Sequence, residues 1–442
     1  MDMTKGPLGK EILFFSIPLI LSNLLQVCFN MSDIAVVGKF AGSEALGAVG
    51  STTILVTLFT GFLIGIGNGV NVLAARFMGL GDEKGLKDSV NTSFVICLIT
   101  GVLLLTVGLL FSGTLLEVLK TKEELIEGAK LYLRIYFLGM PALAVYNFGN
   151  AVLSAAGDTK RPLYFLAAAG VINVCLNLIF VIVFKRSVDG VAAASVISQY
   201  ISAFLIVRFL SKHDFSYSVD FKALSVNKKH AASVLKLGVP SGFQNAVFAI
   251  ANLFIQGAVN SFDTVVVEGN AAAANADPLV YDVMAAFYMA CASFMSINYG
   301  AGNKKRVIKS YYISLAYSAG IGAGLGILLL LFGKEFLALF TNEEAVINEG
   351  IVRLRIMAFS YAVSAFMDCT IAASRGLGKT IVPTVMVILG SCVFRVAWIY
   401  TVFAHFHTVF SLYSLYIFSW SITAAAEIIY FVFAYKKAMS AY

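Results

Sequence analysis

Apolar stretches long enough to cross a membrane run through the whole sequence. A helix needs about 20 apolar residues to span the hydrocarbon of a bilayer. Hydrophobic residues make up 59% of the 442 residues and charged residues 13%, against roughly 25% charge in a typical soluble domain. Because a water-soluble fold cannot bury so much apolar side chain, the sequence predicts an all-α polytopic membrane protein with twelve transmembrane helices. The predicted spans are roughly 12–37, 45–75, 90–111, 131–155, 163–184, 191–210, 233–260, 271–298, 308–333, 350–374, 381–404 and 411–434.

The first half of the sequence recurs in the second half at a nearly constant spacing. Pro18 has a counterpart in Pro240, 222 positions later, and Thr159 has one in Thr380, 221 positions later. Internal repeats of this kind are how many secondary transporters are built, with the substrate site where the repeats meet. The other pairs are Asn23 with Asn245, Gly79-Leu80-Gly81 with Gly300-Ala301-Gly302, Glu123-Glu124 with Glu343-Glu344, Leu133-Arg134-Ile135 with Leu354-Arg355-Ile356, and Pro162 with Pro383.

A long polar interruption at 211–230 separates the first six spans from the last six. We therefore predict an N-lobe of residues 1–210, a cytoplasmic linker of residues 211–230 and a C-lobe of residues 231–442. Because each lobe has an even number of spans, the two lobes enter the membrane in the same sense. They are then related by a pseudo-two-fold axis along the membrane normal. A cleft between two such lobes can open to either side of the membrane.

The distribution of Lys and Arg predicts the orientation. With the N-terminus in the cytoplasm, inner loops carry about twice as many basic residues as outer loops, as the positive-inside rule requires. We predict a multi-pass protein of the inner (cytoplasmic) membrane with both termini cytoplasmic. The net charge of +7 is dispersed over loops rather than gathered on one face, which argues against a nucleic-acid partner.

Polar residues in the first span fall on one helical face. Asn23, Gln26, Asn30 and Asp33 recur at steps of three, four and three. Ionisable groups inside a membrane are costly and usually face the bundle interior or water. We therefore expect this face to line a cavity. The alternative is that Asp33 lies at the membrane interface and caps the helix or pairs with Lys39.

Asp33 is the predicted centre of ion coupling. A carboxylate in such a setting is suited to exchange a proton. Alternatively, it could hold Na⁺, a hard cation that prefers oxygen ligands, together with the oxygens of Asn173 and Asn177. Ser195 adds a hydroxyl in the same lobe. The predicted cation-coupling set is thus Asp33, Asn173, Asn177 and Ser195.

Further polar residues in the spans are candidates for a substrate cavity. Their alternative role is interhelical hydrogen bonding that only holds the bundle together. Arg395 is the lone cation deep in the eleventh span, and we expect a carboxylate or carbonyl partner for it. The cavity candidates are Gln26, Asn30, Asn147, Asn245, Asn252, Gln256, Asp282 and Asp368.

No catalytic constellation or Gly-rich phosphate loop occurs in the sequence, so we expect neither an enzyme nor an ATP-driven motor. No cofactor is predicted. The energy for transport must then come from an ion gradient or from a partner protein.

Several segments fall in equivalent places of both halves. They are Pro18 and Asp33 followed by Val37-Gly38, then Ala74-Ala75-Arg76-Phe77-Met78-Gly79, Ala156-Gly157-Asp158-Thr159-Lys160-Arg161-Pro162, Asn298-Tyr299-Gly300-Ala301-Gly302, and Ser374-Arg375-Gly376-Leu377-Gly378-Lys379-Thr380. In this order they resemble the multidrug and toxic compound extrusion (MATE) family, and in particular its prokaryotic DinF-type branch. The resemblance implies a twelve-helix, two-lobe antiporter that expels cationic, amphipathic compounds in exchange for Na⁺ or H⁺.

The resemblance also assigns roles to individual residues. Asp33 matches the functional Asp of the family's first span, and Asn173 matches a polar partner in span five. Asn177 stands where relatives of this branch usually have Asp, which leaves the coupling ion and its stoichiometry open. Ser195 falls near a hydroxyl position of the same site. Asp368 lies one turn beyond the span-ten position at which other branches place a carboxylate.

The leading hypothesis is a secondary active multidrug efflux antiporter that works by alternating access of its two lobes. Its expected partners are small organic drug-like substrates and the lipid bilayer, and we expect it to function as a monomer. The alternative is a flippase for lipid-linked precursors with the same broad fold. Such a protein would need several intramembrane Arg residues for pyrophosphate, whereas this sequence offers Arg395 at that depth. A membrane-embedded enzyme or receptor is a third possibility, but it would require clustered catalytic residues or a bundle without a repeat.

Overall fold

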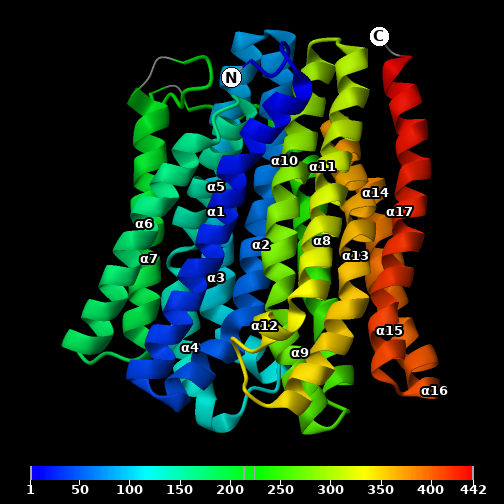
Figure 1. Cartoon of the computed structure of the whole chain (residues 1–442). Coiled ribbons are helices and arrows are strands. Elements are labelled where there is room, and N and C mark those ends of the chain that lie inside the picture. The colour runs from blue at the N-terminus through cyan, green and yellow to red at the C-terminus, as the bar shows by residue number, and fades with distance from the viewer. Residues whose placement is uncertain (1, 213–214, 223, 441–442) are drawn as a thin grey trace. The chain divides into compact units, whose positions relative to one another are not determined.

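The computed structural model describes residues 2–212, 215–222 and 224–440. All regular structure in this part of the chain is helical (Figure 1), and π-helical turns are labelled η. The elements of the first half are α1 (Leu8–Val36), η1 (Val37–Ala41), α2 (Ser43–Leu80), α3 (Glu83–Val118), α4 (Glu123–Phe137), α5 (Met140–Ala155), α6 (Lys160–Leu178), η2 (Ile179–Val183) and α7 (Val188–Lys212). Those of the second half are α8 (Lys228–Val259), α9 (Thr264–Ala274), α10 (Ala276–Gly300), α11 (Lys304–Leu331), α12 (Gly333–Leu337), α13 (Glu344–Gly376), α14 (Ile381–Val387), η3 (Ile388–Val393), α15 (Phe394–Trp398), η4 (Ile399–Phe403), α16 (Ala404–Phe406) and α17 (Val409–Met439).

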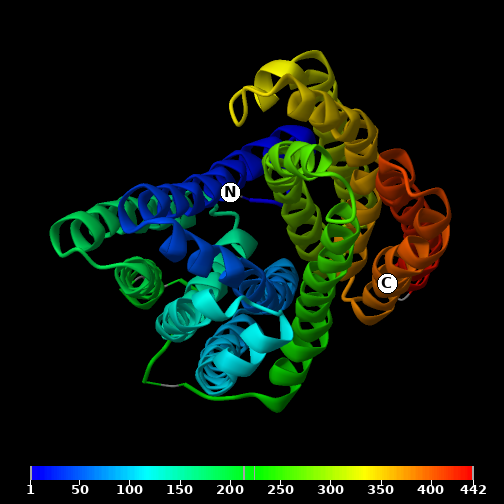
Figure 2. The same cartoon turned by 90° about the horizontal axis from the view of Figure 1, so that it is seen from below.

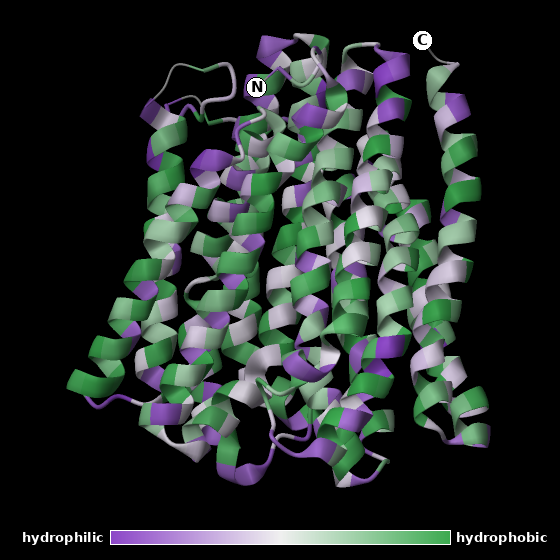
Figure 3. Ribbon diagram, viewed as in Figure 1, coloured by the Kyte–Doolittle hydropathy of each residue, from purple (hydrophilic) through white to green (hydrophobic). Residues whose placement is uncertain are grey.

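Eleven helices in the described residues are long and apolar enough to cross a membrane. The predicted fourth span, 131–155, is divided between α4 and α5, with a break at Leu138 and Gly139. Pro141 explains the new start, because proline fits the first turn of a helix, where its missing N–H is not needed. Figure 3 shows hydrophobic residues along the helices and hydrophilic residues concentrated near their ends. The chain is therefore an all-α, multi-pass membrane protein, and the twelve-helix, two-lobe layout is consistent with this structure.

The internal contacts divide the chain into two compact units. Unit 1 comprises Leu21–Ala246, and unit 2 comprises Asp2–Ile20 with the chain from Val247 onward. The boundaries fall inside α1 and α8, a few residues after Pro18 and Pro240. The lobes predicted at 1–210 and 231–442, with their linker at 211–230, stay a prediction about the transport machinery.

Unit 1 is packed around α2, α3, α4 and α5. The ring of Phe59 on α2 meets that of Phe137 on α4 edge-on at a centroid distance of 4.8 Å. Glycines allow α8 to approach α2 closely. A Cβ on Gly69 would lie 2.7 Å from the backbone nitrogen of Gly238, a distance that no real side chain tolerates. The helices α6 and α7 pack against each other, as Figure 1 shows and Figure 2 gives from below, and they carry most of the predicted coupling residues.

Unit 2 is packed around α10, α11, α13 and α17. The start of the chain is tied to this unit by hydrogen bonds. Asn298 Nδ2 donates to the carbonyl of Met3 at 3.1 Å, and Arg306 donates to the carbonyl of Gly6 at 2.8 Å. Arg306 also forms an ion pair with Glu11 at 3.2 Å. The residues before the unit boundary in α1 are therefore held by α10 and α11.

Candidate functional site: a carboxylate cluster in unit 1

Asp33 lies near the end of α1, next to the π-helical turn η1. Its carboxylate accepts one hydrogen bond on each oxygen: Asn177 Nδ2 donates to Oδ1, and Ser195 Oγ donates to Oδ2 at 3.3 Å. The donors come from two different helices, α6 and α7. Hydrogen bonds to an ionised acceptor are among the stronger ones in proteins, so this arrangement stabilises a charge that would otherwise be costly to bury.

A second set of hydrogen bonds orients the two donors. Asn173 and Asn177 are four residues apart on α6, so their amides face the same side of the helix. Asn177 Nδ2 also donates to Asn173 Oδ1 at 3.3 Å, and Asn173 Nδ2 donates to Ser195 Oγ at 3.4 Å. The structure thus brings together the four predicted coupling residues Asp33, Asn173, Asn177 and Ser195, which we call the Asp33 cluster.

One oxygen of the Asp33 cluster is left without a partner. Asn177 has an exposed fraction of 0%, and its Oδ1 accepts no hydrogen bond from the residues that the structure describes. A buried polar atom without a partner costs roughly 1–3 kcal/mol. A proton donor or a cation that reached this oxygen would remove that cost.

The close approach of α1 to α6 places Asp33 within reach of its donors. A Cβ built on Gly170 would overlap the ring of Phe29. Phe29 lies one turn before Asp33 on α1, and Gly170 lies one turn before Asn173 on α6. Any side chain at 170 would force the Phe29 ring or one of the two helices to move at the level of the cluster.

Two tyrosines of α4, Tyr132 and Tyr136, interact electrostatically with Asp33. Their rings stack with centroids 5.9 Å apart. The sequence analysis did not assign them to the coupling site. Their spacing of four on the amphipathic helix α4 is the signal that places them on one face.

Pairing of Asp33 with Lys39, the alternative raised from the sequence, is not found. Lys39 Nζ lies 5.7 Å from the centroid of the Phe40 ring. None of the ion pairs within residues 2–212, 215–222 and 224–440 involves Asp33. In the same residues, no group of three or more His, Cys, Asp or Glu side chains is placed to hold a metal ion.

The predicted cavity residues have varied surroundings. Asn245 Nδ2 donates to the carbonyl of Gly61 at 2.9 Å and so joins α8 to α2, as the interhelical alternative requires. Asn147 Nδ2 donates within its own helix, to the carbonyl of Leu143 at 2.9 Å. The remaining candidates are the exposed residues Gln26, Asn30, Asn252 and Gln256, of which Gln256 donates to Asn260 at 2.9 Å, and the half-buried acids Asp282 and Asp368.

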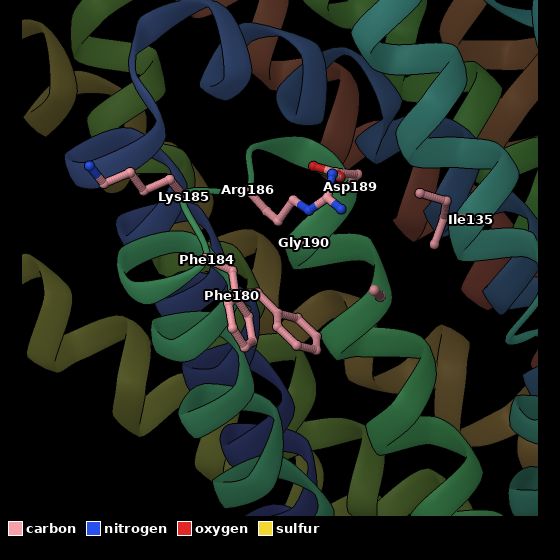
Figure 4. A pocket seen from close by; sticks show the side chains of 8 residues that line it. Ile135, Phe180, Phe184, Lys185, Arg186, Asp189 and Gly190 are labelled. Carbon is pink, nitrogen blue, oxygen red and sulfur yellow. Dashed lines mark ion pairs between the residues drawn. The ribbon is translucent and has the colours of Figure 1, made fainter.

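A pocket of about 670 Å³ opens where η2 meets the start of α7 (Figure 4). Phe180 and Phe184 form one side, and Ile135 of α4 lies across from them. Arg186 and Asp189 also line the pocket and form an ion pair with each other at 3.3 Å. Phe180 follows Asn177 by one helical turn, so the pocket lies close along the chain to the Asp33 cluster.

Comparison with known proteins supports the internal repeat. Residues 18–179 and, again, residues 240–401 match the family model MatE. The two matches begin 222 positions apart (240 − 18), which is the spacing of Pro18 and Pro240.

The chain is similar to several bacterial proteins over most of their length. "Probable multidrug resistance protein YpnP" of Bacillus subtilis is 33% identical over 363 residues, covering 81% of this chain and 80% of that protein. "Multidrug export protein MepA" of Staphylococcus aureus is 24% identical over 400 residues, covering 85% and 84%. The "FAD transporter" of Shewanella oneidensis is 24% identical over 357 residues, covering 78% and 77%.

A solved structure has the same fold. It is described as the "outward-facing conformation of a multidrug resistance MATE family transporter of the MOP superfamily". It superposes on this chain with a TM-score of 0.91 at 22% sequence identity, and the superposition covers 99% of this chain and 98% of that one. Because the family model matches both halves of the sequence, this chain belongs to the MatE family, the multidrug and toxic compound extrusion transporters.

Proposed function

We propose that this protein is a secondary active multidrug efflux antiporter driven by Na⁺ or H⁺, in which the Asp33 cluster binds the coupling ion. The observation that carries the proposal is a membrane-embedded carboxylate held by hydrogen-bonding residues from two other helices. The relatives named multidrug resistance and multidrug export proteins support the substrate class, small organic and often cationic compounds.

The coupling ion acts by changing the hydrogen bonds of Asp33. In the ionised state, Asp33 accepts from Asn177 and Ser195. On protonation, the Asp33 carboxyl group becomes a hydrogen-bond donor. The unpartnered Oδ1 of Asn177 can accept that hydrogen bond after the amide group rotates. Na⁺ would instead be held by oxygens of Asp33, Asn173 and Asn177, the kind of hard ligand that it prefers. In either case, a difference in ion affinity between two conformations drives the cycle.

The wider setting is part of the same proposal. The protein functions as a monomer in the inner membrane with both termini in the cytoplasm, and it requires no cofactor. Its two lobes give the substrate access to each side of the membrane in turn.

Drug transport in proteoliposomes tests the proposal. Asp33→Asn keeps the size of the side chain but removes the charge, so we expect drug uptake driven by either imposed gradient to be lost. The matched control is Asp189→Asn, which alters the Asp of the Arg186 ion pair and should retain transport. Imposing Na⁺ and H⁺ gradients separately identifies the ion. Wild-type transport by the Asp33→Asn protein would refute the role of the cluster.

A further inference from the structure

Arg395 of α15 is a buried cation without an acid in contact with it. Its exposed fraction is 2%, and none of the ion pairs within residues 2–212, 215–222 and 224–440 involves it. Its Nε donates to Ser419 Oγ at 3.2 Å, whereas its buried Nη2 donates to no acceptor in the same residues. Because arginine stays protonated in proteins, the guanidinium keeps its full positive charge.

Three aromatic rings hold this guanidinium. Its central carbon Cζ lies 4.7 Å from the ring centroid of Tyr416, 5.3 Å from that of Trp420 and 5.6 Å from that of Phe248. The face of an aromatic ring is partly negative and attracts a cation. The rings therefore explain why the side chain stays in this place, but they carry no net charge that would balance it.

A second donor without a partner belongs to the same group of rings. Tyr281 of α10 meets the Trp420 ring edge-on at a centroid distance of 5.8 Å, and it packs in one apolar cluster with Phe248, Tyr416 and Trp420. Its Oη atom is buried and has no hydrogen-bond partner among the residues that the structure describes. Two donors, Arg395 Nη2 and Tyr281 Oη, thus belong to side chains that contact one ring and lack an acceptor.

The acids of the surrounding helices do not supply that acceptor. Asp277, one turn before Tyr281 on α10, accepts from Arg353 at 2.5 Å and from Tyr361 at 2.7 Å. Asp368 of α13 interacts electrostatically with Arg395, but the two form no ion pair. The charge of Arg395 is therefore not neutralised by a carboxylate in contact with it.

A buried charge without a partner is very unfavourable. A water molecule can accept from both donors, but it does not balance the charge. Because both donor atoms are shielded from solvent, a monatomic anion suits them better than an organic carboxylate, which needs an open cleft. We propose that Arg395 Nη2 and Tyr281 Oη bind a monovalent inorganic anion of the size of chloride in unit 2.

The internal repeat places this anion site opposite in charge to the Asp33 cluster. Tyr416 follows Ser195 of the cluster by 221 positions (416 − 195), which is the spacing of the other repeated markers. The position that corresponds to Asp33, 222 residues later, is Ile255. The second half of the chain therefore has an apolar residue in place of the acid. Binding of the anion does not depend on transport, so the site stands apart from the proposed function.

Quenching of tryptophan fluorescence by bromide tests the site in the purified full-length protein. The chain has two tryptophans, so Trp398→Phe leaves Trp420, which is 5% exposed, as the only reporter. Sodium bromide replaces sodium gluconate at constant ionic strength. Bromide bound beside Trp420 should quench its fluorescence until the site is filled, whereas quenching by collision rises without limit. Chloride added at saturating bromide should restore the fluorescence by competition, because chloride is a poor quencher.

Three further substitutions, each made in the Trp398→Phe chain, assign the site to its residues. Arg395→Gln removes the charge, so the saturable quenching should disappear. Tyr281→Phe keeps the ring but removes Oη, and a lost hydrogen bond to a charged partner should raise the half-saturating bromide concentration by about tenfold or more. The matched control is Tyr311→Phe, which removes a buried phenol that has a partner, Thr370, at 2.9 Å. It should leave that concentration unchanged.

The possible results separate clearly. Quenching that rises linearly with bromide, or that chloride does not reverse, overturns the anion site. Saturable quenching that survives in Arg395→Gln shows that bromide binds elsewhere and also overturns it. If Arg395→Gln does not fold, Tyr281→Phe decides: a higher half-saturating concentration supports the site, and an unchanged one refutes the role of Oη. Drug uptake by Asp33→Asn is measured separately, so this proposal and the proposed function can fail independently.

Discussion

The substitution Gly170→Ala tests the geometry of the Asp33 cluster without changing any group that binds the ion. Position 170 lies on the face of α6 that meets the ring of Phe29 on α1. The added methyl group overlaps this ring, so the ring or the helix must move. Because Asp33 is one turn beyond Phe29, a shift of α1 draws the carboxylate away from Asn177 and Ser195.

The size of the effect follows from the cost of overpacking. An extra methyl group in a packed interior typically costs about 1–3 kcal/mol. Where this strain is relieved by separating α1 from α6, the cluster binds its ion more weakly by about 5- to 150-fold. We therefore expect the ion concentration that gives half-maximal drug transport to rise within that range.

The assay is drug uptake by proteoliposomes over a series of H⁺ and Na⁺ concentrations. A matched control is Gly50→Ala on α2, where an added Cβ meets no atom within 4 Å, and here the ion dependence should not change. Phe29→Leu combined with Gly170→Ala should restore part of the wild-type dependence. If Gly170→Ala binds the coupling ion normally, contact between α1 and α6 does not position the cluster.

Three further substitutions test other parts of the structure. Arg353 is 4% exposed and pairs with Asp277 at 2.5 Å. Arg353→Met leaves the Asp277 carboxylate without its partner, so it should lower the free energy of unfolding by about 3–5 kcal/mol, as measured by thermal unfolding. Adding Asp277→Asn to the same chain should recover part of this loss. Burial raises the pKa of the Tyr217 phenol, and the nearby Asp158 carboxylate raises it further. The difference in ultraviolet absorbance between the wild type and Tyr217→Phe should therefore show a phenolate whose titration midpoint lies above a pH of about 10. A midpoint at or below that pH would contradict the burial of this side chain. Arg306→Gln removes the hydrogen bond to the Gly6 carbonyl and the ion pair with Glu11. Limited proteolysis should therefore cut the first residues of the chain faster than in the wild type. An unchanged rate of cleavage would show that these two interactions do not hold the start of the chain.

The sequence predicts the fold well because the length of an apolar stretch directly reflects the thickness of a bilayer. Eleven of the predicted spans are long helices. The break in the span predicted at 131–155 was missed, since the apolar pattern continues across it. The sequence does contain Gly139 and Pro141 at this point, and both can end or start a helix. However, Pro18 lies inside the continuous helix α1. A proline alone therefore does not show whether the helix breaks at that position.

The Asp33 cluster could be assembled from the sequence only in part. Asn173 and Asn177 share a helical face by their spacing, and Asp33 stands out by its charge. The sequence analysis did not find Tyr132, because α4 contains three Glu, one Lys and one Arg and its tyrosines resemble ordinary packing residues. For Arg395 the sequence suggested a carboxylate or carbonyl partner, whereas the structure gives Ser419 and a set of aromatic rings. Spacing along one helix does not reveal which distant side chains lie opposite it.

The division of α1 between the two units has a consequence for how the protein could be assembled from fragments. A cut between α7 and α8 would leave residues 2–20 on the first fragment, although they pack with the second. The first fragment would thus carry an arm that the second fragment needs, anchored through Asn298 and Arg306. Residues 228–246 of α8 would likewise stay on the second fragment, although they belong to the first unit. Co-expressed fragments should therefore reassociate through both segments, and removing residues 2–20 from the first fragment should weaken complementation.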